Sequence, residues 1–437
     1  MKNIIISIFT TLTLLSCNVD LDQEPVLTPS SDTITAEQSL LGSYAFLQAA
    51  TNEEFYFGTL RSDIGFAQSF EAPYANFDRF DSALVDASDL ILLPYWFNLY
   101  RTIIATNRTI ELTAEPNALS LEARFLRAYS YFRLVQSFGA VPINTLSDVS
   151  FVTNEPFERD SVSDVYDFII EDLTLAMNLD ILGPDMVNGR PSAYSAMALL
   201  AKVHMANGSP LLAEPLLLEV IENSGAILEP SYETLFSDGG ESSSEILFSV
   251  QYGATGDTFS NEFTFEVTGG FSRIINPTTD FLRESYEDGD IRAGLTFNDD
   301  LQAIVKHFSD DMSRNSSEAD WIALRLADII LLYAEASFVN GTKTNTEVLA
   351  LLDDIRDRAE LAPLDIADFP TDNDVFQAIK DERKVELAWE GQRWFDLLRW
   401  GDAQTALGFT NDDYLLFPIP IQEVLATSGV INQNPGY

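Results

Sequence analysis

Apolar residues recur every three to four positions along most of the chain, a spacing typical of amphipathic helices. One face of the segment 120–138 carries Phe125, Tyr129 and Phe132, for example. The same pattern predicts further helices at Ala36–Ala50, Asp89–Leu112, Ser161–Leu179, Ser192–Asn207, Pro210–Asn223, Asp320–Val339, Asn345–Glu360 and Asp372–Trp400. The last of these is expected to break near Gly391.

Two pairs of these segments are predicted to form helical hairpins, because short turns rich in glycine or proline separate them. The breaker Gly208-Ser209-Pro210 joins one pair, and Gly341 lies in the turn of the other. Small residues such as Ala198 and Ala334 occur where the paired helices would cross closely. The pattern favours tetratricopeptide-like stacking of helix pairs, although the sequence carries no repeat of fixed period.

Two stretches depart from the helical periodicity. Residues 53–87 are aromatic and loop-like. Residues 228–317 combine strand candidates, at Glu245–Tyr252 and Glu262–Thr268, with Gly, Ser and Asp turns. We therefore predict a mostly helical domain over residues 35–437, in which a helical scaffold carries two loop-rich insertions.

The N-terminus has the layout of a signal peptide, with an apolar stretch, Ile4–Leu15, that is too short to span a bilayer. It ends in LLSC, the pattern of a bacterial lipobox, in which the cysteine receives a diacylglycerol after cleavage. This cysteine, Cys17, is the only one in the sequence, which excludes an internal disulfide and a cysteine-based zinc site. We predict a signal peptide over residues 1–16, lipidation of Cys17 and an acidic tether over residues 17–34. A buried free cysteine after an ordinary signal is the alternative.

The chain is strongly acidic, with 25 basic and 68 acidic residues and a formal net charge of −43. Such a charge repels nucleic acid phosphates and argues against a nucleic-acid partner. It also disfavours, more weakly, a polyanionic ligand. Solubility in a salty medium is a sufficient explanation for the excess of acidic residues.

The sequence offers no catalytic or metal-binding motif. Its two histidines, His204 and His307, have neither HExxH nor HxH spacing, and no serine elbow accompanies them. Glu382 and Glu386 lie four residues apart among basic neighbours and are interpreted as helix ion pairs. Carboxylate pairs of a surface glycosidase could come from anywhere in the chain, so chance pairs are uninformative among 68 acidic residues. We predict a binding protein without cofactor or metal, with a surface glycosidase as the alternative.

Several longer stretches resemble, in this order, motifs of the SusD/RagB family of outer-membrane nutrient-binding lipoproteins. They are WFNLYRTIIATN from Trp96, EARFLRAYSYFRLVQSFGAVPI from Glu122, SVSDVYDFIIEDLTLA from Ser161, GRPSAYSAMALLAKVHM from Gly189, SSSEILFSVQY from Ser242, WIALRLADIILLYAEA from Trp321, IRDRAEL from Ile355, DERKVELAWEGQRWFDLLRWG from Asp381, FPIPIQEV from Phe417 and the final QNPGY from Gln433. Their order and the terminal QNPGY carry the resemblance.

The resemblance implies a SusD-like fold, with four tetratricopeptide-like helix pairs under a more irregular ligand-binding half. It also implies a lipid-anchored protein of the outer membrane that binds an oligosaccharide or polysaccharide. The protein would pass this ligand to a TonB-dependent transporter, a SusC-like barrel. A peptide, as in the RagB branch, is the alternative ligand. The acidic residues after Cys17 resemble the surface-export signal of some Gram-negative lipoproteins and indicate the cell surface.

A sugar site needs exposed aromatic rings, flanked by polar groups, on a rigid rim. The five tryptophans all fall in helical motifs and are expected to pack in the core, which leaves Phe and Tyr for stacking. In relatives the ligand platform is built from about the two loop-rich parts of the chain. The aromatic candidates there, each with core packing as the alternative, are Phe70, Tyr74, Tyr252, Phe259 and Phe271. Arg61 and Asp63 are candidate partners for sugar hydroxyls, with an internal ion pair as the alternative.

Overall fold

The structure is a computed structural model, in which contacts between residues join the chain from Ala36 to Tyr437 into a unit. The residues that it describes are 34–66, 89–113, 116–147, 158–186, 189–237, 240–252, 267–268, 271–272, 278–298, 303–304, 306 and 320–437. The predicted signal peptide, Cys17 and nearly all of the tether therefore lie outside the described residues.

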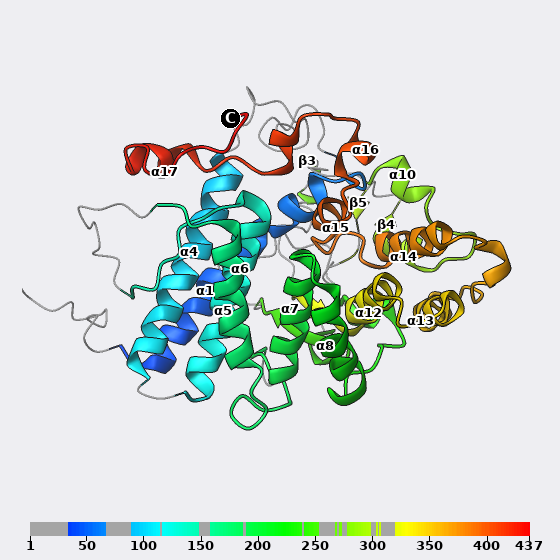
Figure 1. The fold of residues 1–437 in the computed structure, drawn as a ribbon, viewed down its shortest axis with the longest axis horizontal. Coiled ribbons are helices and arrows are strands. Elements are labelled where there is room, and N and C mark those ends of the chain that lie inside the picture. Colours follow the sequence, from blue (N-terminus) through cyan, green and yellow to red (C-terminus); the bar gives the residue numbers. More distant parts are fainter. Residues whose placement is uncertain are drawn as a thin grey trace, which may run out of the picture. The chain divides into compact units, whose positions relative to one another are not determined.

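Helices dominate this unit, as the hydrophobic pattern predicts (Figure 1). The long helices are α1 (Ala36–Phe55), α4 (Asp89–Leu112), α5 (Ala118–Phe138), α6 (Val162–Ala176), α7 (Ala193–Ala206), α8 (Pro210–Asn223), α12 (Leu326–Asn340), α13 (Asn345–Arg358) and α14 (Asp372–Glu386). The shorter helices are η2 (Tyr56–Leu60), α9 (Tyr232–Leu235), η4 (Gly240–Ser242), α10 (Asp280–Arg283), α11 (Arg292–Thr296), η5 (Ile366–Asp368), α15 (Arg393–Trp400), α16 (Ala403–Leu407), η6 (Asp412–Leu415) and α17 (Ile421–Ala426). The expected mostly helical fold is confirmed.

Capping residues set several helix ends. Ser161 begins α6 by accepting a hydrogen bond from the backbone N–H of Asp164, as its sequence predicts. Thr371 caps α14 in the same way, and Asp374 returns the bond to complete a capping box. At the other end of a helix, Gly341 stops α12 with φ of 64°, a left-handed conformation that suits glycine.

Long helices that follow each other in the sequence also pack against each other. Contacts join α1 to α4, α4 to α5, α5 to α6, α6 to α7 and α7 to α8. Helix α8 then packs on α12, which contacts both α13 and α14. Most buried apolar residues of α1 and α4–α8 belong to one core, and α12, α13 and α14 enclose a second. This stacking is compatible with the expected tetratricopeptide-like scaffold.

A strand pair interrupts the helices where the sequence led us to expect a helix. Residues 321–325 form β6 (Trp321–Arg325), which pairs antiparallel with β1 (Ile246–Val250), and α12 begins only at Leu326. Both strands are buried along their whole length, so hydrophobic periodicity alone could not separate this strand from the helix after it. The other described strands are β2 (Val267–Thr268) with β3 (Phe271–Ser272), and β4 (Phe297–Asn298) with β5 (Ala303–Ile304).

The start of the first predicted insertion is also helical, which corrects the loop-like interpretation of residues 53–60. Helix α1 continues to Phe55 and passes into η2, a π-helical turn. Phe55, Tyr56 and Phe57 are buried there, because η2 packs against α15 in the core. Residues 67–87, the last part of that insertion, lie outside the described part of the chain.

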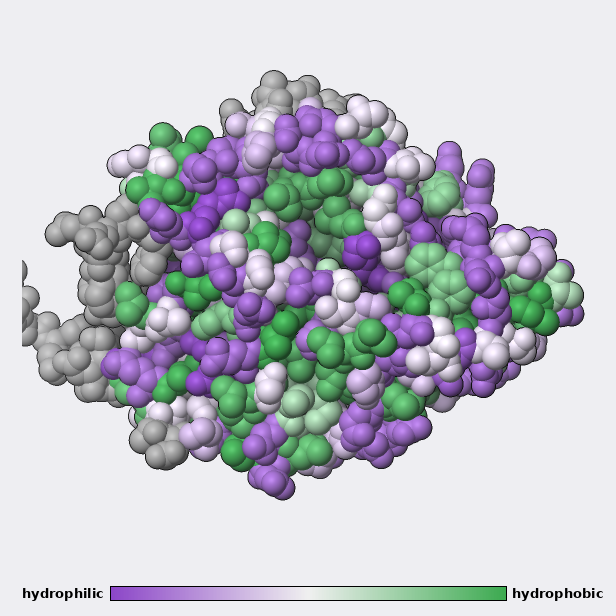
Figure 2. All heavy atoms as spheres, in the orientation of Figure 1, coloured by the Kyte–Doolittle hydropathy of each residue, from purple (hydrophilic) through white to green (hydrophobic). Residues whose placement is uncertain are grey.

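Among the described residues, no helix is both long enough and apolar enough to cross a membrane. Figure 2 shows apolar patches interleaved with polar ones on one face of the molecule. Single exposed apolar side chains, such as those of Leu211 and Leu425, are common on folded proteins.

Candidate ligand-binding site

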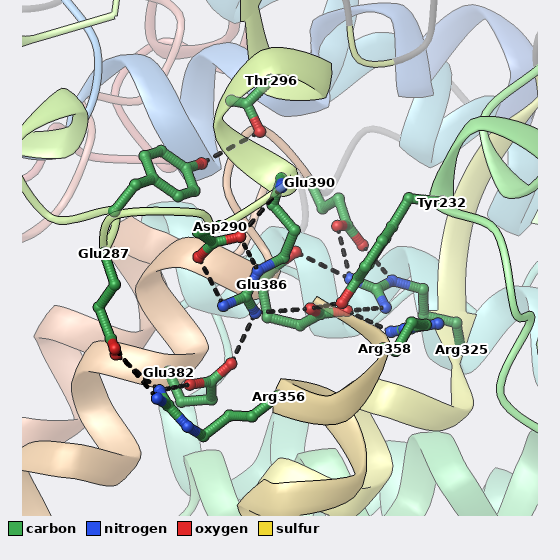
Figure 3. A network of polar contacts seen from close by, with 12 residues as sticks. Tyr232, Glu287, Asp290, Thr296, Arg325, Arg356, Arg358, Glu382, Glu386 and Glu390 are labelled. Atoms are coloured by element: carbon green, nitrogen blue, oxygen red, sulfur yellow. Dashed lines mark hydrogen bonds and ion pairs between the residues drawn. The ribbon is translucent and has the colours of Figure 1, made fainter. Parts of the chain in front are cut away.

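The largest cluster of charged side chains in the described residues is buried between the helices and the β1–β6 pair (Figure 3). Glu386 of α14 accepts hydrogen bonds from Arg358 of α13 at 2.6 Å, Arg325 of β6 at 2.7 Å and Arg292 of α11 at 3.0 Å. The hydroxyl of Tyr232 donates to the same carboxylate at 2.5 Å. Glu386 therefore joins four elements.

This arrangement corrects the interpretation of Glu382 and Glu386 as ion pairs within their own helix. Glu382 also accepts from Arg292, at 2.6 Å, and from Arg356 of α13, at 3.4 Å. The partners of both carboxylates come from other elements, because α14 turns this face toward the interior. Helix spacing reveals which residues share a face, but not what lies opposite that face.

Burial and the neighbouring arginines shift the pKa values of Glu386 and Glu382 in opposite directions. Burial alone would raise the pKa of Glu386, but Arg358, Arg325 and Arg292 hold it well below its ordinary value. Burial raises the pKa of Glu382, and its arginine partners only partly offset this. Because Glu386 is fully buried and its hydrogen bonds are internal, we assign the cluster a structural role rather than a ligand-binding one.

A hollow of about 780 Å³ offers a better site for a ligand. It lies between the turn 62–66, α10, α14, α15 and α16. Helix α14 contributes Asn373, Gln377 and Lys380, whose spacing places them on one face. Its volume is in the range of sites that hold small ligands.

Exposed aromatic rings line this hollow. The side chains of Phe66 and Phe281 are 40% and 48% exposed, which is unusual for rings of this size. Trp400 is half-buried in the wall, where its indole N–H donates to Glu335 at 3.0 Å and fixes the ring. Apolar rings beside polar groups suit the C–H faces and hydroxyls of a sugar.

The backbone holds the two exposed phenylalanines on one rim, although they are far apart in sequence. The N–H of Thr279 donates to the carbonyl of Ile64 at 3.2 Å, and its hydroxyl donates to the carbonyl of Asp63 at 2.8 Å. Gly65 forms a β-bridge with Thr278. The segments that carry Phe66 and Phe281 are thereby tied to each other.

The rim is also fixed from behind. Arg393 of α15 binds the carboxylate of Asp63 through two nitrogens, at 2.8 and 2.7 Å. A Cβ on Gly65 would lie 2.9 Å from the ring of Trp389, so this position requires glycine or a shift of the ring. Trp389 itself has φ of 64°, a strained conformation for a bulky residue and one that recurs near functional sites.

A second hollow, of about 520 Å³, lies between the start of α7, the end of α8 and the approach to β1. Small serine and glycine residues dominate its lining, and its aromatic residue, Tyr194, is buried. None of its described lining residues offers an exposed ring on which a sugar could stack, so we place the candidate site in the first hollow.

Among the described residues, no group of three or more His, Cys, Asp or Glu side chains is arranged to hold a metal ion. His204 is buried in α7, and burial lowers its pKa. The other histidine, His307, lies outside the described residues.

Comparison with known proteins identifies the family. A family model described as "SusD family" matches residues 291–437, and one described as "Starch-binding associating with outer membrane" matches residues 21–205. The chain belongs to the SusD/RagB family.

Relatives of this SusD/RagB protein match almost its whole length. The SusD-like protein P2 of Formosa agariphila is 26% identical, over 98% of both chains. A SusD superfamily protein from Bacteroides vulgatus has the same fold, with a TM-score of 0.78 at 21% identity, over 92% of this chain and 98% of its own. A structure titled "Laminarin binding SusD-like protein" has a TM-score of 0.74 at 24% identity, over 92% and 99%.

The terminal QNPGY motif of the SusD/RagB protein fastens the end of the chain to α5. Asn434 donates to the carbonyls of Phe138 and Phe417 at 3.0 and 2.7 Å. Gln433 exchanges hydrogen bonds with the backbone of Ile419, both at 2.7 Å. The motif that helped to reveal the family is therefore structural.

Arg61 also belongs to this C-terminal region rather than to the hollow. It is buried, donates to the carbonyl of Tyr414 at 3.0 Å and to the hydroxyl of Tyr437 at 3.3 Å, and lies over the ring of Phe417. Asp63, two residues later, does line the hollow. The alternative prediction, an internal ion pair between Arg61 and Asp63, is wrong, because Asp63 pairs with Arg393.

The aromatic candidates are distributed differently from the prediction. Tyr252 is 5% exposed, and its hydroxyl donates to the carbonyl of Gln48 at 2.9 Å, so the structure places it in the interior. Phe271 lies in β3, and nothing is described of its side chain. Phe70, Tyr74 and Phe259 lie outside the described residues.

Sequence reasoning missed Phe66, Phe281 and Trp400 as lining residues. Phe66 lies in the first predicted insertion and Phe281 in the second. Nothing in the sequence distinguishes these two rings, as ligand contacts, from the other aromatic residues of the insertions. Trp96, Trp321, Trp389 and Trp394 are buried as expected, whereas Trp400 ends α15 and reaches the wall of the hollow. Gly401 directly after it predicts the end of the helix, but nothing in the sequence places the tryptophan in the wall of the hollow.

Proposed function

We propose that this SusD/RagB protein is a surface lipoprotein that binds oligosaccharides and passes them to a TonB-dependent outer-membrane transporter. The observation that carries the binding role is the hollow with two exposed phenylalanines on a rim fixed by hydrogen bonds. Membership of the family and a laminarin-binding structure of the same fold support a glycan as the ligand. The transporter partner rests on the family resemblance.

We propose that the protein binds its ligand without cleaving it. A panel of polysaccharides and peptides, examined by affinity electrophoresis and calorimetry, tests this directly. Binding of glycans with no released products is the expected result. Binding of peptides alone would favour the RagB-like alternative, and release of reducing ends would favour a glycosidase.

Replacing either exposed phenylalanine of the rim, Phe66→Ala or Phe281→Ala, should weaken glycan binding about 5- to 30-fold. The loss of one stacked ring removes roughly 1–2 kcal/mol of contact energy. Calorimetry with the glycan that binds the unmodified protein measures the effect. Phe97→Ala is the matched control, because Phe97 is 47% exposed on α4 and does not line the hollow. Equal affinity in all three variants would remove the hollow from consideration.

Replacing the lipobox cysteine, Cys17→Ser, should release the protein from the outer-membrane fraction, because serine cannot form the thioether to a diacylglycerol. Fractionation and labelling with a radioactive fatty acid measure the outcome. Surface display is tested in the same cells by protease accessibility. Continued labelling of the serine variant would show that Cys17 is not the lipidated residue.

A further inference from the structure

Each cation among the described residues that line the candidate hollow is paired with a carboxylate. Arg393 binds Asp63 in a bidentate pair whose side chains are 10% and 9% exposed. Lys380 donates to Asp402 at 2.6 Å, and these side chains are 15% and 40% exposed. The four residues all line the hollow, and their charges cancel.

The other polar groups among the described lining residues are neutral. Asn373, Gln377 and Thr405 are exposed toward solvent and line the hollow. Amide and hydroxyl groups both donate and accept hydrogen bonds, as sugar hydroxyls do. A ligand with many hydroxyls and no charge therefore finds complementary partners without breaking an existing ion pair.

An anionic ligand would have to compete with the carboxylates. Taking Arg393 from Asp63 would leave a nearly buried carboxylate unpaired, which is strongly unfavourable. Lys380 is the easier target, because its pair with Asp402 is more exposed and such pairs are weak. Even there, the carboxylate of Asp402 stays beside any anion that approaches Lys380.

We infer that the hollow selects uncharged oligosaccharides over uronate-containing or sulfated ones, and that Asp402 is a residue that sets this selectivity. The inference rests on the proposed function and adds the chemical class of its ligand. It does not rest on the overall net charge, because it concerns the pairing of individual cations within the hollow.

The test uses three neutral polysaccharides: a β-glucan, a mannan and a galactan. The affinity of the protein for each is compared with its affinity for the sulfated derivative of the same polymer. Calorimetry is carried out at 0.15 M and 1 M salt, where the Debye length is about 8 and 3 Å. We expect a neutral polymer to bind, and its sulfated form to bind at least about tenfold more weakly at both salt concentrations, because a sulfate must be desolvated without gaining a free cation.

The variant Asp402→Asn removes the carboxylate partner of Lys380, whose ammonium stays beside the rings of Phe376 and Trp400. It should strengthen binding of the sulfated polymer about fivefold, the usual scale of an exposed ion pair. The readout is the ratio of the affinities for the sulfated and the neutral polymer, which should rise by a similar factor. Asp167→Asn is the control, since it changes net charge equally at an exposed position of α6 outside the hollow.

The possible results distinguish the proposed selectivity for uncharged ligands from the proposed glycan-binding function. Equal or tighter binding of the sulfated form would overturn the selectivity and leave the proposed function intact. A preference that disappears at 1 M salt, or an equal gain in both variants, would assign the effect to net charge and also overturn it. Failure of every polymer to bind would overturn the proposed function, and the inference with it.

Discussion

Glu386→Gln should lower the free energy of unfolding by about 3–5 kcal/mol, the usual cost of breaking a buried ion pair by removing one partner. Glu386 is fully buried and accepts hydrogen bonds from three arginines. An amide of the same shape keeps most of the packing but leaves these cations without their shared anion. Denaturant unfolding followed by circular dichroism measures the change.

The control for this prediction lies on the same helix. Asp381 of α14 is 51% exposed and pairs only with Lys384 among the described residues, so Asp381→Asn should cost less than about 1 kcal/mol. A loss for Glu386→Gln as small as that of the control would show that the cluster rearranges around the missing charge.

The pH dependence of the same variant tests the cause. The pKa of Glu386 is well below its ordinary value in the folded protein, so its contribution to stability is complete above the unfolded pKa, near 4.3, and is lost as the pH falls through the folded pKa. The stability difference between the wild-type protein and Glu386→Gln should therefore be constant above about pH 5 and shrink in more acidic solution. A difference that does not vary with pH would indicate a packing effect instead.

Hydrophobic periodicity and capping residues were sufficient for the helical scaffold. The predicted bounds of Asp89–Leu112 and Pro210–Asn223 coincide with α4 and α8, and the break near Gly391 separates α14 from α15. These features depend on short-range spacing, which a sequence contains in full. The helix predicted to begin at Asp320 is wrong over residues 321–325, because only pairing with a distant strand, β1, makes this segment a strand.

The candidate site depends on contacts between residues that are far apart in sequence, and the spacing of residues along a helix or strand does not reveal such contacts. The sequence predicts Asp63 as a polar residue of an aromatic region, and it does line the hollow, but its partner Arg393 lies 330 positions away. Phe281 and Phe66 belong to one rim because hydrogen bonds join Thr279 to residues 63 and 64, which are distant in sequence. The aromatic composition limits the predicted site to the two loop-rich insertions. Only the three-dimensional structure shows which residues of these insertions line the hollow.

Gly58→Ala should destabilise the protein by about 3 kcal/mol or more, at the upper end of the range for overpacked cores. An added Cβ would lie 1.9 Å from the carbonyl oxygen of Gly391 and 2.2 Å from its carbon, and backbone atoms cannot turn aside as a side chain can. The N–H of Gly391 donates to the hydroxyl of Thr59 at 3.2 Å, so the two segments are also bonded where they meet. Thermal and denaturant unfolding measure the loss.

Gly42→Ala is the matched control, because nothing lies within 4 Å of its added Cβ and alanine favours the interior of α1 by up to about 1 kcal/mol. The contact at Gly58 also joins η2 to the turn before α15, and the rim of the hollow continues directly from η2. We therefore expect Gly58→Ala to weaken ligand binding even under conditions in which it stays folded, whereas Gly42→Ala should bind as the wild-type protein does. Unchanged binding by a folded Gly58→Ala protein would mean that the pair of Asp63 and Arg393 holds the rim in place without this contact.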